Sequence, residues 1–396
     1  MKKPLKVCIV GLKCYDLLAG AKVPRFIGGI ETQLVLLAKG LVNEGCDVSL
    51  ITYDHGQPDE ETLEGVRIVK AYDPERGIRG VRWPHRARRL WSAMNRADAE
   101  IYLQMGAGVE TGLVGYACRK RNRRARRFVF CFASDANYGR HIHDGLFGGQ
   151  GKLYCYGLRR ACLIVAQTER QRRGLQEALN LQSRVIQMAA DCPANCGLNR
   201  SNKGARHRII WVGRVSREKR LEWLLEIAHR CPELKFQIVG TANGTSEYAT
   251  RLVEQARRIQ NVEVIGRLAP QDMHSVYENA DILCNTSLYE GFPTTFLEAW
   301  SYGLPVVTTF NCDNLVQEHG IGRVASNVDG IVSALRELRD NPEAYQHISR
   351  RARAYYDKNH SVSVVSRRFR ETFEMLVLGE RSIKLTGSAI SFRAVS

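Results

Sequence analysis

Short apolar runs alternate with stretches of helical periodicity along most of the chain. Runs such as residues 5–12, 47–52 and 208–213 have the length and β-branched content of buried strands, and amphipathic segments lie between them. Regular alternation of strands and helices predicts parallel sheets that bind ligands at the carboxyl ends of their strands. The pattern is interrupted at 191–207, where Pro, Cys, Gly and Asn occur without periodicity.

The interruption at 191–207 predicts a linker between domains. A chain of 396 residues is long for one ordinary domain and suits two. We therefore expect an α/β fold with two Rossmann-like parallel-sheet domains at 1–190 and 208–358. A C-terminal helix at 359–378 and a poorly ordered tail at 379–396 should follow.

Positive charge is concentrated in the first half of the chain. Residues 1–200 hold 32 Lys and Arg against 19 Asp and Glu, a net charge of +13, whereas residues 201–396 hold 26 against 22, a net charge of +4, and together these give +17. Such a domain favours an anionic partner, namely a membrane surface, a phosphorylated substrate or nucleic acid. Because no nucleic-acid-binding motif accompanies the charge, we expect no nucleic acid and consider peripheral contact with an anionic membrane.

The cysteines and the start of the chain indicate the compartment. Twelve cysteines are scattered, several inside apolar runs, which is typical of small buried side chains in a reducing cytosol. Met1 and the residues after it lead directly into a strand-like segment, so we expect no signal peptide and a cytoplasmic protein. The closest cysteine pair, Cys192 and Cys196, lacks a second pair at ligand spacing, and we expect no metal site.

Two basic segments of the first half each allow more than one interpretation. Residues 82–96 alternate aromatic or apolar residues with arginines at near-helical spacing. This fits a helix packed on its own domain with a solvated basic face, and it also fits a helix lying on a membrane. Residues 119–127 hold seven cations, more than a helix C-terminus requires, so an anionic surface is a reasonable hypothesis there too. A glycine-rich loop is predicted at 145–151.

The densest chemical signal lies in the second half. Pro293 suits the first position of a helix and Gly303 its end, which predicts a helix over 293–302. Glu290 precedes this helix and Glu298 lies on its second turn, so two carboxylates flank a helix start whose free N–H groups attract an anion such as a diphosphate. Either acid alone would more simply be a solvated surface carboxylate.

The residues around these acids resemble a known family. Glu290-Gly-Phe-Pro, a second glutamate eight residues later and a following Gly-x-Pro-Val-Val are similar to the Glu-x7-Glu element of retaining glycosyltransferase family four, which has the GT-B fold with two domains facing a central cleft. The resemblance implies that Glu290 and the segment after it contact the donor sugar, and that Glu298 holds the nucleotide ribose. The donor-binding residues after Glu290 would be Gly291, Phe292, Thr294 and Thr295.

Two cations follow the first strand of the second domain. Arg214 and Lys219 stand five residues apart, an arrangement that could clamp a diphosphate leaving group, although surface cations are common in loops. They match the family's Gly-Arg…Lys pair. The family commonly has glycine where this chain has Arg220. Arg267 lies where the family contacts the nucleotide base through the backbone.

The first domain matches the family in outline. Gly28 and Gly29 precede a helix, where they either form a plain turn or let phosphate or sugar approach the backbone; the family's Gly-Gly-apolar-Glu lies at this place. Many members have a histidine after the strand that ends at Phe132, and this chain has Asp135 in that neighbourhood. Asp135 could accept a hydrogen bond from a sugar hydroxyl, act as a base toward the acceptor, or only cap a turn.

Together these residues imply a retaining, metal-independent glycosyltransferase. It would transfer a hexose-type sugar from a UDP-, GDP- or ADP-sugar, with no further cofactor, to a glycan or lipid-linked glycan acceptor held by the basic first domain. Cell-surface polysaccharide or lipopolysaccharide synthesis would suit that domain. Two other classes stay open: an epimerase or phosphorylase on the same scaffold, and a non-catalytic protein that binds a nucleotide-sugar.

Overall fold

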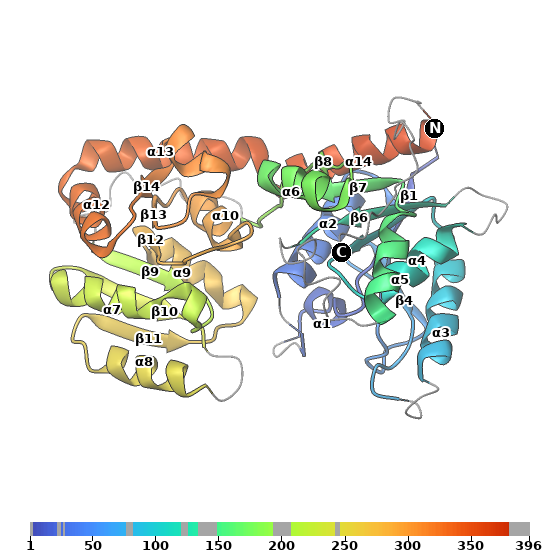
Figure 1. Cartoon of the computed structure of the whole chain (residues 1–396), viewed down its shortest axis with the longest axis horizontal. Helices are drawn as coiled ribbons and strands as arrows, with labels where there is room; N and C mark the ends of the chain where they lie inside the picture. Colours follow the sequence, from blue (N-terminus) through green and yellow to red (C-terminus); the bar gives the residue numbers. More distant parts are fainter. Residues whose placement is uncertain are drawn as a thin grey trace, which may run out of the picture. The chain divides into compact units, whose positions relative to one another are not determined.

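The chain forms two α/β units. The computed structural model describes residues 3–21, 25–26, 28–76, 82–119, 126–133, 149–192, 207–241 and 246–379. Unit 1 comprises Met1–Met188 with Val362–Ser396, and unit 2 comprises Ala189–Ser361 (Figure 1). The expected fold class is confirmed, because each unit is built on a largely parallel sheet. No helix in the described part of the chain is both long and apolar enough to span a bilayer.

Unit 1 contains an eight-stranded sheet in the order β3-β4-β2-β1-β5-β6-β7-β8, in which only β3 is antiparallel to its neighbour. Its apolar core fills the space between the sheet and helices α3, α4, α5 and α6 (Figure 1). The strands are β1 Lys6–Val10, β2 Asp47–Thr52, β3 Glu60–Leu63, β4 Val66–Lys70, β5 Ile101–Met105, β6 Arg127–Cys131, β7 Leu163–Ala166 and β8 Arg184–Val185. The helices are α1 Tyr15–Leu18, α2 Gly29–Asn43, α3 Arg82–Ala97, α4 Glu110–Arg119, α5 Gly149–Leu158, α6 Glu169–Leu179 and α14 Val362–Leu378.

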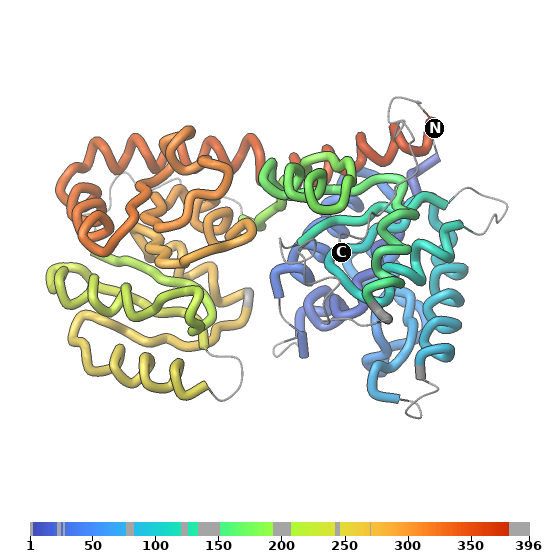
Figure 2. Tube along the Cα trace, in the orientation of Figure 1, coloured from blue at the N-terminus to red at the C-terminus, as the bar shows by residue number. Residues whose placement is uncertain are grey.

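The last helix of the chain belongs to unit 1. Helix α14 packs on α2, as the red and blue parts of the trace show in Figure 2. The approach is close because Gly40 has no side chain: a Cβ there would lie 2.0 Å from the hydroxyl oxygen of Ser366. Arg370 donates a hydrogen bond to the carbonyl of Glu44 at 2.9 Å and forms an ion pair with its carboxylate, which ties α14 to the end of α2.

Two features of unit 1 differ from the sequence prediction. Strand β3 was not predicted, because Glu60–Leu63 is mostly polar and pairs only at the edge of the sheet. The predicted glycine-rich loop at 145–151 is wrong in its last three residues, which begin α5. A later glycine of the same helix, Gly157, lets α5 pack closely on α4. A Cβ on Gly157 would lie 2.3 Å from the carbonyl oxygen of Thr111 in α4.

Unit 2 has a six-stranded, fully parallel sheet in the order β11-β10-β9-β12-β13-β14. Its core lies between the sheet and helices α7, α8 and α12. The strands are β9 Arg208–Val212, β10 Lys235–Val239, β11 Val262–Gly266, β12 Ile282–Asn285, β13 Val306–Thr308 and β14 Gly322–Val324. The helices are α7 Leu221–Arg230, α8 Glu247–Arg257, α9 Met273–Asn279, α10 Thr294–Ser301, α11 Leu315–Glu318, α12 Val328–Asp340 and α13 Pro342–Asn359, with short 3₁₀ turns at Arg217–Lys219, Pro270–Asp272 and Cys312–Asn314.

Candidate functional site

The topology of unit 2 brings two chemically active loops together. Strands β9 and β12 are neighbours in the middle of the sheet, yet the chain continues from them toward opposite edges. In open parallel sheets, ligands bind beyond the carboxyl ends of the strands at such a switch point. Lys219 follows β9 and Glu290 follows β12.

Lys219 and Glu290 form an ion pair across the switch point. The Lys219 ammonium donates to Oε1 of Glu290, and both side chains are mostly buried, with 19% and 12% of their surfaces exposed. The same carboxylate oxygen accepts from the hydroxyl of Ser287 at 2.6 Å and from the amide of Asn285 at 3.4 Å. Glu290 is thus an oriented anion, with a cation beside it at the edge of the sheet.

Helix α10 begins three residues after Gly291 and points its N-terminus toward this edge of the sheet. It starts at Thr294, one residue later than predicted, and no side chain caps it. The first amides of an α-helix have no partner within the helix, so the N–H groups of Thr294 and Thr295 are suited to bind an anion. Phe292, by contrast, is buried and its ring packs against the tilted ring of His360, so its side chain contributes packing.

Glu298, on the second turn of α10, has a separate partner. The phenol of Tyr277 donates to Oε2 of Glu298 at 2.5 Å, and the Tyr277 ring stacks on Tyr302. Burial raises the pKa of Glu298 to about 7, although the Tyr277 hydrogen bond favours the ionised form. Glu298 is therefore poised to gain or lose a proton near neutral pH.

The raised pKa of Glu298 predicts a pH effect on stability. Its ordinary pKa is 4.5, so in the interval up to about 7 the folded protein holds a proton that the unfolded chain has released. The unfolding free energy of the wild type, relative to Glu298→Gln, should therefore fall as the pH rises from about 4.5 to about 7. Urea unfolding of both proteins across this range measures the difference, and a constant difference would contradict the assignment.

The two remaining predicted contacts in unit 2 are more exposed. Arg214 has 62% of its side chain exposed and forms an ion pair with Glu218 at 3.6 Å. Arg267 follows β11 and is exposed. Neither arginine contacts Glu290 directly, so a ligand would have to extend beyond the Lys219–Glu290 pair to meet them.

In unit 1, Gly28 and Gly29 lie at the start of α2. Gly28 is the extended residue before the helix, and Gly29 is its first residue. A Cβ on Gly28 would lie 2.5 Å from a carboxylate oxygen of Glu31 in the first turn, so that acid reaches back over the glycine. Asp135 falls outside the residues that the structure describes.

Three further residues of the site were not predicted from the sequence: Asn285, Ser287 and Tyr277. Asn285 ends a buried strand and Ser287 follows it, and a polar residue at the carboxyl end of a parallel strand is the signal that could have identified them. Tyr277 has no comparable signal, because its hydrogen bond to Glu298 joins two separate helices, α9 and α10.

Comparison with known proteins identifies the family of the chain. Residues 206–341 match the family described as glycosyl transferases group 1, and residues 28–190 match the glycosyl transferase 4-like domain. The amylovoran biosynthesis glycosyltransferase AmsD of Erwinia amylovora is 23% identical over 72% of this chain and 78% of its own length. An uncharacterized glycosyltransferase of Haemophilus influenzae is 32% identical over 37% of this chain, and the match spans 43% of that relative.

Solved structures share the fold at low sequence identity. Sucrose-phosphate synthase from Thermosynechococcus elongatus superimposes with a TM-score of 0.74 and 15% identity, covering 95% of this chain and 100% of that one. HepE of Anabaena, in complex with UDP and glucose, gives a TM-score of 0.68 and 15% identity, with 93% and 99% covered. These likenesses show the fold, and the two family matches cover both halves of the chain. The protein is a group 1 glycosyltransferase with the GT-B fold.

Proposed function

We propose that this glycosyltransferase moves a hexose from a nucleotide-sugar to a glycan or lipid-linked glycan, without a metal ion and with retention at the anomeric carbon. The observation that carries the proposal is the Lys219–Glu290 pair beside the uncapped N-terminus of α10. A cation and free helix amides stabilise the charge that develops on a departing diphosphate, which is the role that a metal ion has in other enzymes.

The contacts of the site support a division of roles. Lys219 and Glu290 neutralise each other in the structure. A bound donor would give each a new partner: the diphosphate would take Lys219, and the sugar hydroxyls would take Glu290. Ser287 and Asn285 already hold the Glu290 carboxylate, so it would keep its orientation when Lys219 moves.

Other predicted residues extend the same proposal along the donor. Arg214 would contact the outer face of the diphosphate, and its exposure leaves it free to move there. Glu298 would accept hydrogen bonds from the ribose hydroxyls, and the backbone at Arg267 would meet the base. Retention would proceed by same-face substitution within an ion pair or through a covalent intermediate. In either case we assign Glu290 to orienting the sugar and stabilising an oxocarbenium-like transition state.

The acceptor and the compartment complete the proposal. AmsD is named for amylovoran biosynthesis, and two matching proteins of Escherichia coli are named for O-antigen biosynthesis. By analogy, we place this chain in cell-surface polysaccharide synthesis, in the cytoplasm and at the inner face of the membrane. The cysteines of the described residues are free thiols, which suits a reducing compartment.

The donor can be identified by thermal shift with UDP-, GDP- and ADP-sugars. A ligand that binds only the folded protein raises Tm, and the increase is larger for a tighter ligand. We expect sugars of one nucleotide class to raise Tm in the presence of EDTA. Proton NMR of the product from that donor should then show the anomeric configuration retained. Inversion, a requirement for a divalent metal, or conversion of the donor to an isomer without an acceptor would contradict the proposal.

A further inference from the structure

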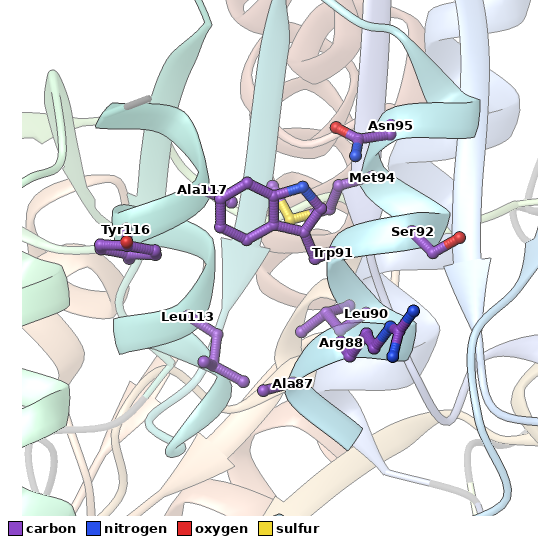
Figure 3. A pocket seen from close by; sticks show the side chains of 10 residues that line it. All are labelled: Ala87, Arg88, Leu90, Trp91, Ser92, Met94, Asn95, Leu113, Tyr116 and Ala117. Carbon is purple, nitrogen blue, oxygen red and sulfur yellow. The ribbon is translucent and has the colours of Figure 1, made fainter. Parts of the chain in front are cut away.

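A surface pocket lies between α3 and α4 of unit 1, outside the predicted donor site. It has a volume of about 520 Å³ and is lined mainly by apolar side chains. Figure 3 shows Trp91 projecting from α3 toward α4, where Leu113 and Tyr116 lie opposite it. The rings of Trp91 and Tyr116 are 5.6 Å apart. The pocket is therefore a slot between two helices, and its wall includes one aromatic ring from each helix.

Helix α3 packs on its own unit and leaves this slot open. Its buried residues Leu90, Ala93 and Met94 belong to the unit 1 core, so the packing interpretation of residues 82–96 is correct for that face. On the outside, Trp83 and Tyr116 are 42% and 44% exposed. Trp83 continues the row that runs through Ala87 and Trp91 at four-residue spacing, so one aromatic ridge follows the slot.

The rim of the slot is cationic. Helix α3 contains five arginines and no acidic residue. Arg86 and Arg96 bond to carbonyl groups of unit 1, but Arg88 and Arg89 are exposed and have no hydrogen-bond or ion-pair partner in the described part of the chain. Arg88 lines the slot itself. An occupant should therefore combine an apolar portion with negative charge.

From this combination we infer that the α3–α4 slot docks on an anionic lipid bilayer and receives a lipid hydrocarbon chain against the rings of Trp91 and Tyr116. Tryptophan and tyrosine favour the bilayer interface because one end of each ring system is apolar and the other polar. Unpaired arginines beside them complement the lipid phosphates. The inference deepens the proposed function by locating its membrane contact, while donor binding in unit 2 does not depend on it.

The test uses the full chain with vesicles of phosphatidylcholine, with and without phosphatidylserine. We expect salt-sensitive co-sedimentation only with the anionic vesicles. Arg88→Ala/Arg89→Ala should weaken that binding roughly 30-fold, since each arginine near an anionic surface strengthens binding about fivefold. The matched control is Arg257→Ala/Arg258→Ala, which removes two adjacent exposed arginines of unit 2 and should bind like the wild type.

A second measurement tests the slot. Lipids brominated on the acyl chain should quench tryptophan emission, and Trp91→Phe should lose much of the quenching while keeping the wild-type Tm. Three results would overturn the inference. The first is a wild type that does not bind the anionic vesicles at all, and the second is an equal loss of vesicle binding in the two double-arginine variants. The third is a protein that binds no vesicles and instead forms dimers that Tyr116→Ala disrupts. All the variants should keep donor binding, so failure here is separate from failure of the proposed function.

A different observation assigns a role to Arg220. Its backbone has φ +47° and ψ +54°, a left-handed conformation that favours glycine, yet this chain has arginine there. The guanidinium donates to the carbonyl of Thr286 at 2.7 Å, to the carbonyl of Ser287 at 3.2 Å and to the hydroxyl of Thr309 at 2.9 Å. It also stacks on the Trp223 ring at 3.9 Å.

Two further bonds join the same loops. The Thr286 hydroxyl donates to the carbonyl of Lys219 at 2.7 Å, and the amide of Leu288 donates to the carbonyl of Glu218 at 2.8 Å. The geometry points to Arg220 as a positioning residue that fixes the loop of Glu290 against the loop of Lys219. This inference rests on the proposed function, because its consequence is the placement of those two groups during transfer.

Arg220→Gly removes the guanidinium and relieves the backbone, so it should fold with a Tm near the wild type. We expect its kcat to fall at least about tenfold while the donor KM changes little, because misplacement of catalytic groups mainly affects the transition state. Added guanidinium ion should restore part of the kcat of Arg220→Gly, but it should not raise the kcat of Lys219→Ala.

Arg220→Lys keeps the positive charge and a long side chain but loses the planar guanidinium. Its kcat should therefore lie between those of the wild type and Arg220→Gly. An active wild type whose glycine or lysine variant keeps full kcat contradicts this inference alone. A wild type without any transfer activity contradicts the proposed function instead.

Discussion

Replacing Lys219 with alanine should lower kcat about 10²- to 10³-fold, which is the usual effect of deleting one preorganised group that stabilises transition-state charge. Lys219 forms an ion pair with Glu290, so its removal also takes a charged partner away from that carboxylate. Glu290→Gln, which keeps the shape and loses the charge, should give a loss of similar size. Release of the nucleotide from the donor measures both variants.

The matched control for this experiment is Lys235→Ala. Lys235 begins β10 of the same unit and is exposed, so its loss should leave kcat unchanged. Donor affinity is measured separately by calorimetry, because a mutation that weakens ground-state and transition-state binding equally raises KM and spares kcat. If Lys219→Ala kept the wild-type kcat, the leaving group could not be stabilised by this lysine.

Gly240→Ala should lower the free energy of unfolding by about 3 kcal/mol or more, because two sources of strain add at this position. Gly240 has φ +131°, and a Cβ there would lie 1.9 Å from the carbonyl oxygen of Gly213. Both glycines follow neighbouring central strands, so the clash would separate the ends of β9 and β10. Urea unfolding followed by circular dichroism measures the loss.

Gly266→Ala separates the two sources of strain. Gly266 has φ +83°, but no atom lies within 4 Å of the position that a Cβ would take. It should therefore show only the cost of the left-handed backbone, about 1 kcal/mol. Equal losses in the two variants would mean that the close approach of Gly213 and Gly240 does not constrain this part of unit 2.

Sequence pattern located the regular elements well wherever a strand was apolar or a helix amphipathic. Strand β2 at Asp47–Thr52 has the predicted bounds. The pattern failed at β3 because an edge strand needs no apolar residues, and at the start of α5 because its glycines were interpreted as a loop. In both places the deciding contact comes from a neighbouring element.

The candidate site shows the same limit at the level of single side chains. The order of acids, cations and glycines, with its resemblance to the family motif, was enough to select Lys219, Glu290 and Glu298. The first two follow strands, and Glu298 lies on the second turn of the helix after Glu290. The pattern did not show that Lys219 would pair with Glu290, or that Tyr277 would hold Glu298. Arg220 was noted in the sequence only as a departure from the family's glycine, whereas its guanidinium joins the two loops.

The sequence by itself determined the two parallel sheets, the family and the chemical groups at the strand ends, because these follow from local periodicity and short motifs. Only the tertiary structure decided which group meets which. The switch in strand order between β9 and β12 brings together residues about seventy positions apart, and the packing of α3 against α4 leaves a slot that neither helix encodes alone. Contacts between distant segments depend on how sheets and helices pack, and no local pattern carries that information.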